Sequence, residues 1–415
     1  MDKEKVLELK QVIEKKLNRP MLYYLDLCTR CGLCYDTCHA YQGIPKKEYS
    51  PVGRAEVVRK VFRKYFRPTG KLFPWWGDAQ EFDENLMEEL REAAFSCTGC
   101  RRCTMFCPFG IDMPYILGIA KELLIAYGNA PEELVMLADG AVEKGKSVDM
   151  FKEGFKGVIK DLEKEVQKLI NAPTSDGLIP MEKKGANILF VGLSGAHSIV
   201  YPAAIFNAAK EDWTLSYFEA VNFGFFAGDS EKANFIANRV INEAKELGVK
   251  EIVIVECGTA YRIPKFLMGP LPFKVSSIVE VIHRYIKEGR IKIKEGAITE
   301  PVTWHDPCQL GRNGGVYDQP REVLNMLAKD YREMNPTREY NWCCGGGGGL
   351  VALDNEEFRI KSGKPKKEQI ERTGAKMVVT ACENCHLQLS TINAGYGMGV
   401  TIESFTKLVG ENLIV

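Results

Sequence analysis

Thirteen of the fourteen cysteines in this 415-residue sequence fall into three compact groups. Only Cys257 stands apart from them. Cysteine thiolates bind iron and zinc, and grouped cysteines in a long chain without a secretory signal are typical of metal sites rather than of a disulfide framework. The cysteines therefore predict metal chemistry, and their spacing indicates its kind.

The first two groups share the spacing CxxCxxCxxxC, in CTRCGLCYDTC and CTGCRRCTMFCP. Two-residue gaps let a looping backbone present three sulfurs to one cluster, and the fourth cysteine in such motifs ligates the neighbouring cluster. We therefore expect two [4Fe-4S] cubane clusters. The expected ligands are Cys28, Cys31, Cys34 and Cys107 for one cluster, and Cys97, Cys100, Cys103 and Cys38 for the other.

A structural zinc site is the alternative for these two groups, but zinc sites use separate CxxC-type pairs rather than four cysteines in one run. Pro108 follows the second group as it does in bacterial-type ferredoxins, whereas His39 stands in that place after the first. The 58 residues between Cys38 and Cys97 read as helical, and this layout resembles the α-helical ferredoxin domain of respiratory iron–sulfur subunits. Two such clusters conduct single electrons.

The third group has the pattern Cx34CCx37CxxC and includes the stretch NWCCGGGGG. Neighbouring cysteines rarely form a disulfide with each other, and five consecutive glycines cost backbone entropy. Five thiolates are one more than a cubane needs. A zinc site and a cubane with a spare thiol are the alternatives to a larger cluster. The five cysteines are Cys308, Cys343, Cys344, Cys382 and Cys385.

The elements that must position these cysteines change in kind along the chain. Residues 1–135 are rich in helical patterns, and 136–185 read as a charged helical linker. From residue 186 onward, short apolar runs alternate with helical patterns, which predicts parallel α/β architecture. The helices are expected at 53–66, 84–95, 114–128 and 230–248, and the buried strands at 186–193, 251–256, 301–306 and 376–381.

The α/β region contains a faint internal repeat, with three pairs of similar segments at offsets of 119, about 125 and about 115 residues. It predicts two related lobes, 186–300 and 301–415, of which the second holds the cysteines. Cys308, the Cys343–Cys344 pair and Cys382 all lie at or near the ends of expected strands. Because loops at the carboxyl ends of parallel strands build sites, these cysteines are expected to converge.

Composition excludes some functions. The 55 basic and 55 acidic residues cancel, so the chain lacks the basic excess of a nucleic-acid-binding protein. The basic run at 59–67 is interpreted as a solvated helix face, and Trp75 and Trp76 as part of a packed loop. Neither a signal peptide nor an apolar stretch of 18 residues is present, which predicts a cytoplasmic protein that reaches a membrane only through a partner.

Together, the helical ferredoxin motifs and the third cysteine group resemble the D subunit of heterodisulfide reductase and other proteins with the cysteine-rich CCG domain. Typical members carry two complete CCG motifs, whereas here NFGFF (222–226) and ECGTAYR (256–262) stand in place of the first. That departure looks most like the group containing DsrK, TmcB and the Hdr-like menaquinol oxidoreductases. The resemblance implies a non-cubane four-iron cluster held by all five cysteines of the third group, with glycine N–H groups donating to its sulfides.

The same resemblance implies cytoplasmic reduction of a sulfur–sulfur bond. Electrons would come from quinol or cytochrome through a membrane partner with b haems, and the acceptor would be a disulfide or trisulfide, on a DsrC-like protein or a small thiol. A sulfur-oxidising relative would run in reverse. The main alternative is an electron-relay subunit of a flavin dehydrogenase for glycolate or glycerol 3-phosphate. A non-enzymatic scaffold that binds zinc is the second alternative.

Residues near the third group are candidates for other roles. His305 and His386 flank its cysteines, and histidine titrates near neutrality, so either is a candidate acid for the leaving thiolate. Cys257 is interpreted as a buried structural cysteine or a substrate-facing thiol. Tyr261 and Arg262 are candidates for orienting substrate.

Overall fold

The computed structural model describes residues 1–75 and 77–415, and the chain divides into two compact units. The first unit contains Met1–Ala138, Phe223–Ala233 and Trp342–Glu368, and the second contains Asp139–Asn222, Asn234–Asn341 and Gln369–Val415. Each unit gathers separate stretches of chain. The four continuous sequence ranges given above therefore stay a prediction of domain organisation.

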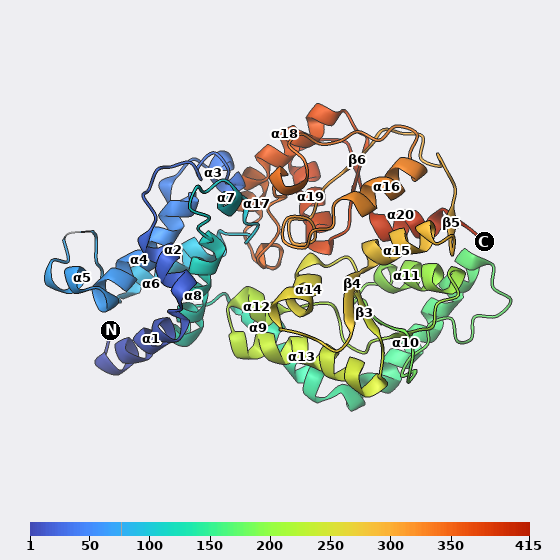
Figure 1. Cartoon of the computed structure of the whole chain (residues 1–415), viewed down its shortest axis with the longest axis horizontal. Coiled ribbons are helices and arrows are strands. Elements are labelled where there is room, and N and C mark those ends of the chain that lie inside the picture. Colours follow the sequence, from blue (N-terminus) through green and yellow to red (C-terminus); the bar gives the residue numbers. More distant parts are fainter. Residues whose placement is uncertain (76) are drawn as a thin grey trace. The chain divides into compact units, whose positions relative to one another are not determined.

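The first unit is helical (Figure 1). Its core is built where α8 packs against α1, α4 and α6, with Leu90, Leu117 and Leu124 fully buried. The helices are α1 (Lys3–Lys16), α2 (Arg19–Asp26), α3 (His39–Gly43), α4 (Pro51–Phe66), α5 (Pro68–Leu72), α6 (Glu84–Phe95), α7 (Arg102–Met105), α8 (Met113–Tyr127), α12 (Phe223–Ala227) and α17 (Glu356–Ser362), with η1 (Lys47–Tyr49) and η4 (Leu350–Ala352).

Local signals in the sequence explain where these helices begin and end. The side chain of Ser50 accepts a hydrogen bond from the N–H of Gly53 at 3.0 Å and caps α4, and Pro51 occupies the first turn, where its missing N–H costs nothing. Asp112 caps α8 in the same way, and Gly128 ends that helix with a left-handed φ of 87°. The predicted helices at 53–66, 84–95 and 114–128 are confirmed as α4, α6 and α8.

The second unit contains two parallel sheets. The first has the strand order β2-β1-β3-β4 and the second has the order β6-β7-β8. The strands are β1 (Ile188–Val191), β2 (Trp213–Leu215), β3 (Glu251–Ile254), β4 (Lys274–Ser277), β6 (Val302–Trp304), β7 (Met377–Thr380) and β8 (Thr401–Ser404), with β5 (Lys292–Ile293) and β9 (Leu413–Ile414) pairing antiparallel.

The two sheets repeat one arrangement. The order β1-β3-β4 corresponds to β6-β7-β8, and a parallel bridge between Val302 and Tyr331 stands where the first sheet pairs β1 with β2. The strands predicted at 186–193, 251–256, 301–306 and 376–381 are β1, β3, β6 and β7. The predicted α + α/β fold class, with two related α/β lobes, is therefore confirmed.

Helices surround both sheets of the second unit (Figure 1). Helix α15 begins with a capping box in which Ser277 and Glu280 each bond the other's backbone. The helices are α10 (Val148–Ile170), α11 (His197–Ala208), α13 (Ser230–Leu247), α14 (Gly258–Arg262), α15 (Ile278–Lys287), α16 (Asp318–Leu327), α18 (Lys364–Thr373), α19 (Glu383–Tyr396) and α20 (Phe405–Glu411), with η2 (Ile263–Leu267) and η3 (Arg338–Tyr340). Helices α9 (Glu132–Lys146), α13 and α18 pass from one unit into the other.

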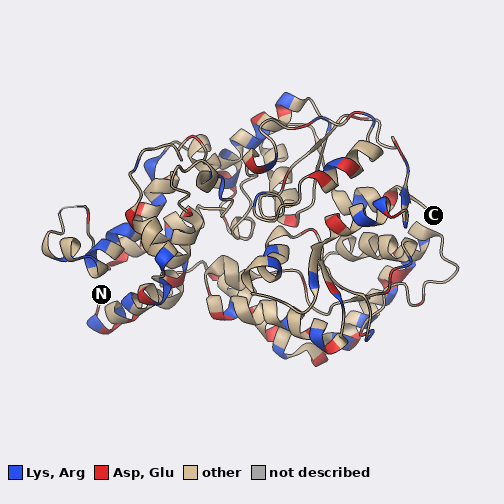
Figure 2. Ribbon diagram, in the orientation of Figure 1, with Lys and Arg blue, Asp and Glu red and all other residues tan. Residues whose placement is uncertain are grey.

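Two expectations about the surface need correction. Arg59, in the run interpreted as a solvated face, is 2% exposed, because its guanidinium donates to the carbonyls of Tyr24 and Leu25 at 3.0 Å. Trp75 is 78% exposed rather than packed, and Trp76 lies outside the described residues. Figure 2 shows basic and acidic residues interspersed along the ribbon, as a formal net charge of zero suggests.

Across residues 1–75 and 77–415, the helices include none that combines the length and the apolar character needed to cross a bilayer.

Candidate functional site

Both N-terminal cysteine motifs wind around two residues with left-handed backbone. They are Arg30 (φ 57°) and Gly32 (φ 84°) in the first motif, and Gly99 (φ 66°) and Arg101 (φ 61°) in the second. These are the third and fifth positions of each motif. Left-handed residues turn the chain sharply, and arginine adopts that conformation only where the surroundings hold it there. The two motifs therefore form loops of the same kind.

Each loop forms one wall of a small cavity, which also takes one cysteine from the other motif. Both cavities are small and partly open to solvent. Four thiols around one small volume fit the ligand requirement of a four-iron cluster. The first cavity is lined by Cys28, Cys31, Cys34 and Cys107, and the second by Cys38, Cys97, Cys100 and Cys103.

Arg54 lies beside the second cavity and was not among the predicted site residues. Its side chain is buried, and Nε and Nη2 donate to the hydroxyl and carbonyl oxygens of Ser96, each at 2.8 Å. Nη1 lies 3.5 Å from the Cys38 sulfur. Burial opposes the charge, but the Cys38 and Cys97 thiolates raise the pKa of Arg54 above its ordinary value. The sequence signal was its position on the buried stripe of α4, one turn before Val58.

The Cys343–Cys344 pair and the glycines after it belong to the first unit. The N–H groups of Gly345 and Gly346 point at the sulfurs of Cys343 and Cys344, with N–S distances of 3.4 and 3.5 Å. A Cβ on Gly347 would lie 2.8 Å from the carbonyl oxygen of Thr98. The glycine run therefore supplies donors to the sulfurs and lets the loop lie against the second motif.

Two cations hold this loop on the first unit. The guanidinium of Arg102 lies 3.7 Å from the centre of the Trp342 ring and donates to the carbonyl of Thr37 at 2.9 Å. The ammonium of Lys121 donates to the carbonyls of Phe226 at 2.6 Å and Gly348 at 3.2 Å. Both ends of the CysCysGly segment are thereby fixed.

The other three cysteines of the third group lie in the second unit, after the carboxyl ends of β6 and β7. Cys308 and Cys382 are 8% and 9% exposed, and Cys385 is 4% exposed. A ring nitrogen of the buried His305 and the Cys385 sulfur lie within 4.8 Å of each other. His386 is half-buried on α19. The five cysteines of the third group are thus divided between the two compact units.

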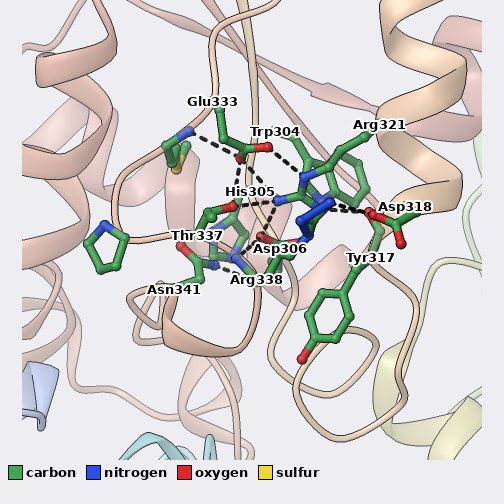
Figure 3. A network of polar contacts seen from close by, with 12 residues as sticks. Trp304, His305, Asp306, Tyr317, Asp318, Arg321, Glu333, Thr337, Arg338 and Asn341 are labelled. Carbon is green, nitrogen blue, oxygen red and sulfur yellow. Dashed lines mark hydrogen bonds and ion pairs between the residues drawn. The ribbon is translucent and has the colours of Figure 1, made fainter.

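A buried carboxylate fixes the loop that carries His305 and Cys308 (Figure 3). Asp306 accepts hydrogen bonds from the Trp304 indole at 2.9 Å and from Arg321 Nη1 and Nη2 at 2.8 and 2.7 Å. Arg321 also binds Glu333, with Nε 2.6 Å from the carboxylate. Since both charges of the Asp306–Arg321 pair are nearly excluded from water, each depends on the other.

The same network reaches the segment that leads to the cysteine pair. The side-chain amide of Asn341 donates to the carbonyl of Asp306 at 2.8 Å, and the N–H of Arg338 donates to its carboxylate at 3.1 Å. Arg321 donates to the hydroxyl of Thr337 at 2.8 Å. Residues 337–341 are therefore tied to the end of β6. This network had no signal in the sequence beyond the polar residues around Cys308.

Cys257 lies against the CxxC segment of the second unit. Burial raises the pKa of the Cys257 thiol to about 12, and the neighbouring Cys382 sulfur adds to the rise. The N–H of Glu383 donates to the carbonyl of Glu256 at 2.9 Å. A Cβ on Gly258 would lie 2.7 Å from the backbone nitrogen of Leu310. The segment ECGTAYR of the degenerate first motif is thus packed against both cysteine segments of the second unit.

Tyr261 and Arg262, candidates for orienting substrate, are both buried, at 2% and 7% exposure. Burial and the nearby Glu280 carboxylate raise the pKa of Tyr261. Nη1 of Arg262 donates to the side chain of Gln309 at 3.2 Å, next to Cys308. Their described contacts are with neighbouring elements of the second unit.

Comparison with known proteins agrees with this arrangement. The 4Fe-4S dicluster domain family matches residues 24–111, and the cysteine-rich domain family, CCG, matches residues 302–390. The fold and these matches define an iron–sulfur oxidoreductase with a dicluster domain and a CCG domain.

Three curated proteins are similar to most of this chain and indicate the kind of oxidoreductase that it resembles. An Hdr-like menaquinol oxidoreductase iron-sulfur subunit of Archaeoglobus profundus is 28% identical, covering 100% of this chain and 83% of its own. The D subunit of the dihydromethanophenazine:CoB–CoM heterodisulfide reductase of Methanosarcina mazei is 26% identical over 96% of both chains. An EtfAB:quinone oxidoreductase of Syntrophomonas wolfei is 26% identical, covering 87% of this chain and 54% of its own. The chain therefore carries a CCG domain and, over nearly its whole length, is similar to the D subunit of heterodisulfide reductase.

Proposed function

We propose that this chain is the catalytic iron–sulfur subunit of a membrane-associated complex that reduces a disulfide or trisulfide, or forms one in the reverse direction. The observation that carries the proposal is the distribution of its cysteines. Two cavities are each lined by four cysteines, and five more cysteines accompany an unusual glycine run. Relatives named as quinol and heterodisulfide oxidoreductases support the redox class.

The two four-cysteine cavities would hold cubane clusters, and the five cysteines of the third group would hold a non-cubane cluster. The cubane clusters would supply electrons one at a time. The third cluster would be the site at which two electrons reach one sulfur–sulfur bond. Five thiols exceed the need of a cubane, and the N–H groups of Gly345 and Gly346 already point at cysteine sulfurs. Donors of that kind stabilise added negative charge on a cluster.

Cleavage of the sulfur–sulfur bond takes two electrons and two protons and gives two thiols. His305 is the better placed of the two candidate acids, because a ring nitrogen lies within 4.8 Å of the Cys385 sulfur in a buried setting. The half-buried His386 would exchange protons with solvent. Cys257, beside Cys382, would face the same reaction space.

The partners would be a quinone-reactive cytochrome b subunit, which would hold the chain at the cytoplasmic face of the membrane, and a sulfur substrate that is either a DsrC-like protein or a small thiol. The relatives' names support the quinol side of this proposal.

A second candidate is an electron-relay subunit that works with a flavoprotein. The similarity to an EtfAB:quinone oxidoreductase favours it. In that case the chain would exchange electrons with the flavoprotein and would not cleave sulfur–sulfur bonds.

The substitution Cys344→Ser tests the proposal. With a reduced viologen as donor, the variant should lose reduction of disulfides and trisulfides and keep about eight irons per chain, the content of two cubanes. Cys257→Ser removes a cysteine outside the three ligand sets; it is the control for iron content alone and should keep all the iron. Undiminished sulfur–sulfur reduction by Cys344→Ser would rule the proposal out, and a wild-type protein that reacts only with a flavoprotein would establish the relay.

A further inference from the structure

A buried hydrogen-bonded chain joins the second N-terminal motif to the cysteine pair, inside the first unit. His39 Nδ1 lies 3.2 Å from the carbonyl oxygen of Ser362, and Nε2 lies 3.2 Å from the hydroxyl of Thr98. The same hydroxyl lies 3.4 Å from the Cys343 sulfur. His39 and Thr98 are 3% and 1% exposed. Since a carbonyl only accepts, Nδ1 carries a proton and donates it to Ser362, which fixes the ring orientation.

The cysteine pair is close to the second motif in other respects. Ligand atoms of His39, Cys100 and Cys343 lie within 4.8 Å of one another. A Cβ on Gly348 would lie 2.7 Å from the carbonyl oxygen of Cys97, so only glycine allows this approach. The segment after Cys343 is therefore seated directly on the loop between Cys97 and Cys100.

In the first motif, the threonine equivalent to Thr98 is not buried beside the cysteine pair. Thr29 occupies the position equivalent to Thr98 but is exposed, as is Cys31. The first cavity is lined by residues 28–34, 52, 107–109, 111 and 113. Leu33 on its rim is 57% exposed. The two sites therefore differ in surroundings although their loops are alike.

We infer that the cluster of the second motif, rather than that of the first, exchanges electrons with the centre at Cys343 and Cys344, and that Thr98 and His39 are the positioning residues of this junction. The inference rests on the proposed function. One electron passes, so the second-motif cluster is oxidised as the C-terminal centre is reduced, and no covalent bond changes. A hydroxyl donor to the Cys343 thiolate favours the reduced centre, and His39 holds that hydroxyl in place by donating from Nε2–H to its oxygen.

The test uses the full chain with clusters assembled anaerobically, and no sulfur substrate. Thr98→Val removes the hydroxyl, Thr98→Ser restores it, and Thr29→Val is the matched control in the first motif. His39→Phe keeps a flat ring but removes both nitrogens. It is the second test of the junction if Thr98→Val loses iron. Potentiometric titration followed by EPR gives the midpoint of each cluster, and rapid mixing with a one-electron reductant gives the rate at which the C-terminal centre is reduced.

At a fixed potential, Thr98→Val should lower the ratio of reduced to oxidised C-terminal centre about threefold to tenfold, the size expected for one hydrogen bond. His39→Phe should shift it in the same direction, Thr98→Ser should restore it, and Thr29→Val should leave it unchanged. A C-terminal centre that titrates as wild type in both Thr98→Val and His39→Phe, or that shifts equally in Thr29→Val, would overturn the inference. A chain without any third centre would instead count against the proposed function.

Discussion

Buried charged side chains in this protein are paired with hydrogen-bond acceptors or with groups of opposite charge. Arg54 donates to Ser96 and lies beside the Cys38 sulfur, and Arg321 binds Asp306 and Glu333. An unpaired charge at such depth would cost several kcal/mol, so each pairing constrains which substitutions the site tolerates.

Replacement of Arg54 should change one cluster and spare the other. Arg54→Gln removes a buried positive charge beside Cys38 and within electrostatic reach of Cys97. Because a cation stabilises the more negative, reduced cluster, the midpoint potential of the second-motif cluster should fall. EPR-monitored potentiometry of the two N-terminal clusters measures the effect.

Arg30→Gln is the control for that experiment. Arg30 lies in the first motif, pairs with Glu56 at 2.8 Å, and its side chain is 56% exposed, so solvent screens it. Its replacement should leave both midpoints nearly unchanged. Equal shifts of both clusters in Arg54→Gln, or none, would refute the assigned role.

Glu243 makes the stability of the second unit depend on pH. Burial raises the pKa of this carboxyl to about 7, although the Ser216 hydroxyl and the Tyr217 N–H, at 3.0 Å, oppose the rise. The folded state therefore holds the proton more tightly than the unfolded state, and stability is lost as pH rises from the unfolded pKa, about 4.3, through about 7. Glu243→Gln cannot ionise, so its stability advantage over wild type should be about 1 kcal/mol at pH 5 and should be largest at pH 8.5.

Urea unfolding of the two proteins at pH 5 and pH 8.5 measures that difference, with a gain of up to about 3 kcal/mol expected at the higher pH. Glu231→Gln, an exposed position on the same helix, is the control and should leave the pH dependence intact. The same slope in Glu243→Gln and wild type would show that Glu243 is not the source.

At the scale of elements, the ends of strands and the loops beyond them carry the site. The end of β6 is held by the Asp306–Arg321 pair, and residues 337–341 bind back to it (Figure 3). The loop with His305 and Cys308 therefore owes its shape to a buried polar network rather than to regular secondary structure.

Removal of the buried carboxylate of this network should lower the free energy of unfolding far more than removal of an exposed ion pair at its edge. Asp306→Ala leaves Arg321 buried with a lost partner and should destabilise the second unit by about 3 to 5 kcal/mol. Asp318→Ala removes the pairing of an exposed carboxylate with Arg338 and should cost at most about 1 kcal/mol. Urea unfolding followed by tryptophan fluorescence compares the two. Equal costs would mean that the network does not support the loop.

The sequence was informative about elements that are long or strongly periodic. The helices α4, α6, α8 and α13 followed from apolar periodicity, and the strands β1, β3, β6 and β7 followed from short apolar runs. The strands β5 and β9 have two residues each, too few to form such a run. Arg59 was hidden in a basic stretch because composition cannot tell which face of a helix is buried. The contact of Cys343 with Thr98 depends on long-range folding that no local pattern encodes.

At the scale of the whole molecule, the distribution of the cysteines defines the central question. The two N-terminal sets lie in the first unit, and the third set is divided, with Cys343 and Cys344 in the first unit and the other three cysteines in the second. A third cluster held by these five cysteines is what the proposed sulfur–sulfur reductase needs beyond an electron relay.

Iron content together with EPR of the anaerobically purified protein, before and after addition of a thiol, tests that claim most directly. A sulfur–sulfur reductase with three clusters should contain about twelve irons per chain and should give a new signal from the oxidised C-terminal cluster on adding thiol. About eight irons with no thiol-dependent signal would contradict it and leave a protein that only relays electrons.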